Sequence, residues 1–371
     1  MLNVQKIGQG MALAVMASSL FTGCSYAVKS GTNLALGFSE RHIVPPILAM
    51  NDSDMVCNSG NALTPAIMAT KDMGGDPTRI AVLLYTASGM CAENQALEAE
   101  LRYLRASKSG NVTEAQDARI EQKRWAATAA QRQYTAYQLF AERWEAKHKA
   151  TLGDSCPTMR SELDQTVYLL GMISGLQAMT NDINSGGEAN VPKDIAAIVE
   201  RGMTCLDNNK FWGAPQATRA VIWTLLPGSG DGKPDPYQTL KQSVQIGEQK
   251  GVRMSHALYA VAAQASGDDN KIRDALRTYH ASLAEDKPVN PDYRLIDTMA
   301  GMMVRGISDR YWTENTGVRT AEGGMSSFWD EQQSGNELED LFEGGDTNGV
   351  EDSSDIEAEA SDTPNETKQG N

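Results

Sequence analysis

The sequence has few of the residues and motifs that mark catalytic or metal sites. It contains only four histidines (His42, His148, His256 and His280), which lie far apart, and it has no CxxC or HExxH string. Zinc sites and zinc proteases need such ligands at short, fixed spacings. Residues 228–233 (GSGDGK) lack the spacing and the hydroxyl residue of a phosphate-binding loop. The sequence therefore predicts no metal, no cofactor and no enzymatic activity.

Strand-like alternation of apolar and polar residues is also missing, whereas apolar residues recur at helical spacing. Asp76-Pro77 is typical of a helix start, and the helix that follows is expected to end at Gly110. Thr113 and Gln116 form a capping-box pattern for a second long helix that runs to about Lys149. These two helices are expected to pack as a hairpin. Further helices are expected at 159–182, 192–208, 214–225, 236–250, 253–266, 272–285 and 292–312.

The first residues have the pattern of an export signal. Met11–Phe21 is apolar, but it has about half of the roughly 20 residues that a membrane span requires. The string Leu20-Phe-Thr-Gly-Cys24 follows, and it resembles the lipobox of bacterial lipoproteins. Residues 1–23 are therefore expected to be a signal peptide, and Cys24 to be the lipidated residue. The alternative is an ordinary signal peptide with an incidental cysteine. Because Ser25 rather than aspartate follows, we expect an anchor on the periplasmic face of the outer membrane.

Four further cysteines remain for the exported chain: Cys57, Cys91, Cys156 and Cys205. An even number of cysteines in an oxidising compartment is typical of disulfides. Three pairings are possible, and we favour Cys57 with Cys91 and Cys156 with Cys205, because each pair would join consecutive helices. Buried free thiols are the alternative.

The negative charge is concentrated near the C-terminus. The chain has a net charge of -15; fourteen acidic residues and Lys368 follow from position 330, so this end carries -13 and the rest only -2. Residues 321–371 are expected to be a disordered acidic tail, because so few apolar side chains cannot offset the entropy lost on folding. Two interpretations of the tail remain: a solubilising or dispensable extension, or an acidic arm that binds a basic partner or divalent ions. Net negative charge without a basic stripe argues against nucleic-acid binding.

The region 24–320 is expected to be an all-α domain of stacked helix hairpins. Small and aromatic residues between Ala257 and Pro288 resemble a degenerate tetratricopeptide repeat (TPR). Gly171, Gly175 and Ala178 lie along one side of a helix and favour close packing against a neighbour. Larger side chains leave two interpretations open, since each could belong to a ligand groove or to the core. These side chains are Met172, Met179, Met299, Met302, Met303, Trp212 and Trp223.

Several segments resemble one known family, the T component (TatT) of tripartite ATP-independent periplasmic (TRAP) transporters. The resemblance covers about residues 25 to 285 and is carried by the segments 54–66 (DMVCNSGNALTPA), 76–84 (DPTRIAVLL), 167–171 (VYLLG), 212–215 (WGAP), 235–237 (DPY) and 251–259 (GVRMSHALY). The resemblance implies a periplasmic lipoprotein of TPR-like helices that self-associates and contacts the transporter's solute-binding protein.

Two functions follow as hypotheses. The first is a TRAP transport accessory that binds the solute-binding protein and an apolar ligand. The second is a scaffold lipoprotein of envelope assembly that uses the same helical surfaces to bind other proteins.

Overall fold

The computed structural model describes residues 26–226 and 228–331, which form helices, turns and loops without a strand. The expectation of an all-α fold is confirmed. Cys24, the signal segment 1–23 and the part of the tail beyond 331 lie outside the described residues. The helices span residues 26–42, α2 (Val44–Leu48), α3 (Ser53–Ala69), α4 (Thr78–Lys108), α5 (Val112–His148), α6 (Glu162–Ser185), α7 (Ile195–Gly202), α8 (Ala214–Leu225), α9 (Pro236–Lys250), α10 (Met254–Ser266), α11 (Asp269–Ala281) and α12 (Arg294–Thr316), with 3-10 turns η1 (Met203–Cys205) and η2 (Pro291–Tyr293).

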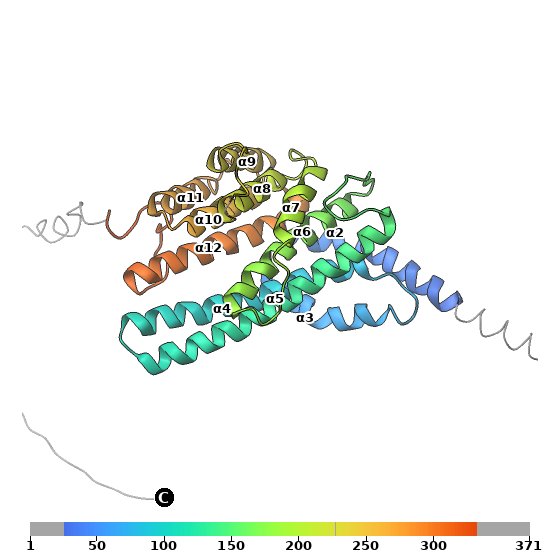
Figure 1. Ribbon diagram of the computed structural model, residues 1–371, viewed down its shortest axis with the longest axis horizontal. Helices are drawn as coiled ribbons and strands as arrows, with labels where there is room; N and C mark the ends of the chain where they lie inside the picture. The colour runs from blue at the N-terminus through green and yellow to red at the C-terminus, as the bar shows by residue number, and fades with distance from the viewer. Residues whose placement is uncertain (1–25, 227, 332–371) are drawn as a thin grey trace, which may run out of the picture. The chain divides into compact units, whose positions relative to one another are not determined.

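The two longest helices, α4 and α5, form the hairpin that the sequence predicts, and α3 and α6 pack beside it (Figure 1). Small residues set the spacing between these helices. A side chain at Gly89 would come within 2.6 Å of Gln133, and one at Gly175 would come within 2.6 Å of the Tyr137 ring. Gly171 approaches Phe140 equally closely. The close packing expected along α6 is therefore present, and these glycines permit it.

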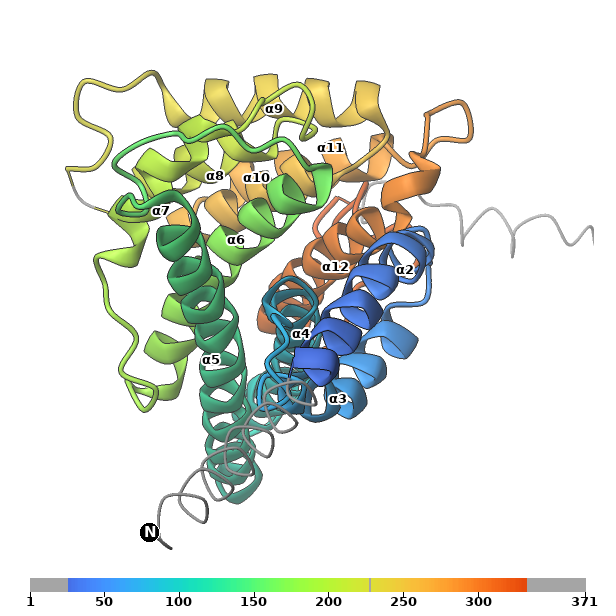
Figure 2. The same cartoon turned by 90° about the vertical axis from the view of Figure 1, so that its right-hand side faces the viewer.

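Shorter helices, α7 to α11, form the other part of the fold, and α12 lies between them and the long hairpin (Figure 2). Arg253, at the start of α10, joins three segments. Its buried guanidinium donates to the Asp297 carboxylate of α12 at 2.7 Å and to the Ser282 carbonyl at 2.7 Å. Because a buried charge needs such partners, this contact fixes α10 and α11 against α12.

The N-cap of the second long helix differs from the expectation. This helix is capped by Asn111 rather than Thr113, since the Asn111 side chain accepts the Glu114 N–H at 3.2 Å. An asparagine before a helix satisfies a free N–H as well as threonine does, so the sequence pattern alone could not choose between them.

The chain after α12 turns back along that helix. The Thr320 N–H donates to Asp309 at 3.2 Å, and the Trp312 indole donates to the Gly324 carbonyl at 2.8 Å. Contacts with α12 therefore extend a few residues into the segment 321–371. Phe328 begins a second unit, of which residues 328–331 are described.

Candidate apolar ligand site

An apolar cavity of about 160 Å³ lies between α2, α3, α4 and α12, and one residue of α6 reaches it. Its walls are almost entirely aliphatic side chains and methionines, and none of them carries a charge. The lining residues are Val44, Ile47, Leu48, Met50, Met55, Val56, Ser59, Leu63, Ile80, Leu83, Leu84, Thr86, Ala87, Leu170, Leu295, Ile296 and Met299. A cavity of this size and composition binds an apolar molecule better than it binds water, because water needs two or more polar partners.

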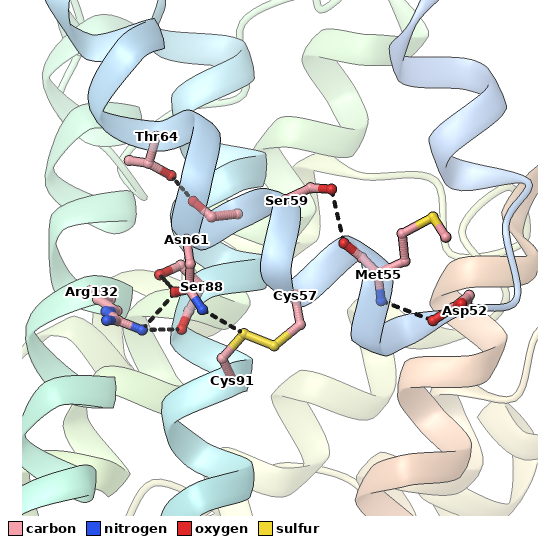
Figure 3. Close-up of a disulfide and its surroundings, with 10 residues drawn as sticks. Asp52, Met55, Cys57, Ser59, Asn61, Thr64, Ser88, Cys91 and Arg132 are labelled. Carbon is pink, nitrogen blue, oxygen red and sulfur yellow. Dashed lines mark hydrogen bonds between the residues drawn. A yellow bond between two sulfur atoms is a disulfide. The ribbon is translucent and has the colours of Figure 1, made fainter.

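The two hydroxyl groups in the wall are already satisfied by the protein. The Ser59 hydroxyl donates to the Met55 carbonyl at 2.8 Å (Figure 3). The Thr86 hydroxyl donates to the Val82 carbonyl at 2.8 Å and lies 2.8 Å from the hydroxyl of Ser174. Neither hydroxyl is activated by a base, and both have local partners. The lining therefore offers a ligand mainly shape and apolar contact.

The cavity has a closed side and an open side. Val56, Leu295 and Ile296 are buried at its closed side. Met55 and Leu63, on α3, are 54% and 49% exposed, so they stand at its edge toward solvent. Methionine has a long, flexible side chain that can adapt to different apolar shapes. The exposed edge of the cavity therefore includes side chains of α3.

A disulfide holds the α3 wall in place. Cys57 of α3 is bonded to Cys91 of α4, with 5.5 Å between their Cα atoms (Figure 3). One turn further along, Gly60 lets the two helices touch, since a side chain there would come within 2.8 Å of the Leu84 carbonyl oxygen. The disulfide and this close contact fix the position of α3 against α4.

Polar contacts surround this disulfide on its other side. The Asn61 amide donates to the Cys91 sulfur at 3.3 Å, and its oxygen accepts from the Ser88 hydroxyl at 2.8 Å. Arg132 of α5 donates to the same Asn61 oxygen at 3.0 Å and to the Ser88 carbonyl at 2.8 Å (Figure 3). The contacts link α3 to α4 and α5. Cys156 and Cys205 form the second disulfide, with 5.0 Å between Cα atoms, and this pairing is also the one favoured from the sequence.

An ion cluster joins helix ends near the cavity. Arg79, at the start of α4, pairs with Glu40 and lies 3.4 Å from Asp164 of α6. Lys147 of α5 donates to Asp164 at 2.8 Å. Burial acts to raise the pKa of Asp164, but the hydrogen bond and charge of Lys147, with the nearby arginines, outweigh it and hold the pKa below its usual value. In Glu40, burial prevails and raises the pKa despite Arg79.

A second polar group lies within the long hairpin. The Glu93 carboxylate of α4 accepts from Gln133 of α5 at 3.1 Å and from Asn181 of α6 at 3.3 Å. Asn181 also donates to the Gln133 oxygen at 2.8 Å. Burial raises the pKa of Glu93, and the two amide hydrogen bonds offset only part of this effect. The triad satisfies its own members and connects three helices.

Other residues singled out in the sequence divide between cavity and core. Met299 lines the cavity, whereas Met172 and Met179 are buried in α6. Trp212 and Trp223 are packing residues. The Trp212 ring packs 4.7 Å from the Tyr293 ring, measured between centroids, and the Trp223 indole donates to Glu200 at 3.0 Å. Met50 and Met55, which the sequence interpretation left aside, also line the cavity.

Among the residues that the structure describes, no group of three or more His, Cys, Asp or Glu side chains could hold a metal ion. His256 is buried and contacts the Tyr279 ring edge-on, and burial with the charge of Arg253 lowers its pKa to about 4. In the described part of the chain, no helix combines the length and apolarity needed to cross a membrane. No family model matches the chain, and no curated protein or solved structure matches it either.

Proposed function

We propose that the chain is a lipoprotein anchored at Cys24 on the periplasmic face of the outer membrane, where it acts as the T component of a TRAP-type transport system. Its helical body binds an apolar ligand in the cavity between α2, α3, α4 and α12 and contacts the solute-binding protein. The 160 Å³ aliphatic cavity, walled by a disulfide-bonded helix pair, is the observation that carries the ligand role. The transport role is supported by the resemblance of residues 25–285 to the T component.

Displacement of a fluorescent alkyl probe tests the ligand role. Met299→Trp places a bulky ring in the cavity, and we expect it to weaken probe binding about tenfold, which is about 1.4 kcal/mol. Met73→Trp is the matched control, because Met73 is an exposed methionine outside the cavity. If the two variants bind the probe equally and their melting temperatures are unchanged, the probe binds outside the cavity. The cavity would then no longer support the ligand role.

Binding to the purified solute-binding protein of a TRAP transporter encoded beside this gene tests the transport role. We expect the folded, disulfide-bonded chain and the solute-binding protein to sediment together as one species. Two separate sedimenting species at micromolar concentrations would contradict the transport assignment and leave the ligand role to stand on its own test.

A further inference from the structure

The helix over residues 26–42 has an inner face that packs on the body of the protein. A side chain at Gly75 would come within 2.7 Å of Thr32 and 3.0 Å of Leu36, so the loop before α4 presses directly against these residues. Glu40, two turns from Thr32, is buried and pairs with Arg79. These three residues recur at every fourth position and define the side that faces the protein.

The opposite face carries large apolar side chains although it is exposed. Leu34 is 76% exposed and Phe38 is 59% exposed. At 100° per residue, Leu34 is turned about 160° from Leu36, and Phe38 and Arg41 lie within about 40° of Leu34 on this outer side. The surface helices of soluble domains normally carry polar residues there. Aromatic and aliphatic side chains beside a cation are typical of helices that lie in a membrane interface.

The position of this face in the chain indicates what covers it. Tyr26 is two residues from Cys24, so their Cα atoms lie within about 7.6 Å of each other. An acylated Cys24 would therefore keep the first turn of the helix at the surface of the bilayer. We propose that residues 26–42 lie on the membrane, with Leu34 and Phe38 in the boundary between headgroups and acyl chains and with Arg41 at the lipid phosphates. This inference rests on the proposed lipidation of Cys24.

Such a contact would orient the protein as well as tether it. Lipid chains alone hold a protein at the surface but leave it free to rotate about the attachment point. A helix bound along the surface removes that freedom, and Glu40–Arg79 and the Gly75 contact transmit its orientation to α4. The long hairpin then has a fixed direction relative to the bilayer.

Quenching by brominated lipids tests the contact. The full-length lipoprotein is purified from membranes, its lipid on Cys24 is verified by mass spectrometry, and it is placed in vesicles of phosphatidylethanolamine, phosphatidylglycerol and brominated phosphatidylcholine. Phe38→Trp adds a fluorophore on the proposed membrane face. Ile120→Trp is the matched control, because Ile120 is exposed on α5 beside the Arg102–Glu121 ion pair. The control position is also far from the helix over 26–42, because Arg102 lies 23 residues beyond Arg79 on α4, a distance of about 35 Å.

We expect the added emission of Phe38→Trp to fall about twofold in brominated vesicles and that of Ile120→Trp to remain unchanged. Lipid on Cys24 with equal quenching of the two variants would overturn the inference and leave the anchor intact. Absence of lipid on Cys24 would overturn the anchor and the inference together. A lower molecular mass in detergent for Leu34→Glu than for the wild type would assign this face to contacts between copies and would also overturn the inference.

Discussion

The cavity region and the long hairpin are packed with side chains of different sizes. In the hairpin and α6, glycines and alanines bring helices into direct contact. Around the cavity, leucines, isoleucines and methionines surround a hollow of about 160 Å³. Small residues therefore concentrate where rigidity is needed, and large flexible ones where a ligand could be accommodated. Stability and binding should then respond to different substitutions.

Removal of the disulfide beside the cavity should have the largest effect on stability. Cys57→Ala combined with Cys91→Ala opens a loop of 34 residues, and the entropy gained by the unfolded chain predicts a loss of about 4 kcal/mol. Denaturant unfolding of the oxidised protein measures this change. Because α3 is then held less firmly, the cavity region should also lose protection from hydrogen exchange before the hairpin does. Equal loss of protection in the two regions would contradict the view that the disulfide holds the cavity region in particular.

Overfilling the close-packed region should have the next largest effect on stability. Gly175→Leu would force a side chain into the Tyr137 ring, at a cost of about 3 kcal/mol. The control is Ser59→Leu, which adds similar bulk to a partly exposed position at the cavity wall and should cost less than about 1 kcal/mol. Thermal and denaturant melts of the two variants compare the regions directly. Similar losses would show that the cavity wall is packed as tightly as the hairpin.

The smallest effect concerns the polar triad inside the hairpin and depends on pH. Burial raises the pKa of Glu93, so the unfolded carboxyl ionises before the folded one as pH rises above about 4.5. Stability contributed by this group is present below that pH and declines until the raised folded pKa is passed. Glu93→Gln should therefore raise the melting temperature at pH 8 and leave it nearly unchanged at pH 4. A decrease at pH 8 would mean that the carboxylate is stabilising when ionised.

The ends of α8 and α9 were predictable because local residues determine them. Their bounds agree with the expected 214–225 and 236–250, whereas α7 and α11 differ by several residues from the expected 192–208 and 272–285. Pro215 and Pro236 occupy first-turn positions, and Gly251 ends α9 with a positive φ of 71°. Such signals act over one helical turn and can be identified without knowledge of tertiary contacts.

The cavity could not be predicted in the same way. Its walls bring together Val44 and Met299, which are far apart in the sequence, and α2 has two prolines in five residues instead of a helical pattern. Methionine content alone was ambiguous, since Met299 faces the cavity whereas Met172 is buried in α6. Whether an apolar side chain lines a hollow or fills it depends on the neighbouring helices, so only the tertiary structure distinguishes the two.

Calorimetric titration with an apolar ligand such as 1-decanol, repeated at several temperatures, tests the central claim most directly. Burial of apolar surface in the cavity predicts saturable binding at one site with a negative heat-capacity change, with affinity about tenfold weaker in Met299→Trp and unchanged in Met73→Trp. Saturable binding with the same affinity and heat-capacity change in both variants, or no binding to the folded wild type, would contradict the assignment of the cavity as a ligand site.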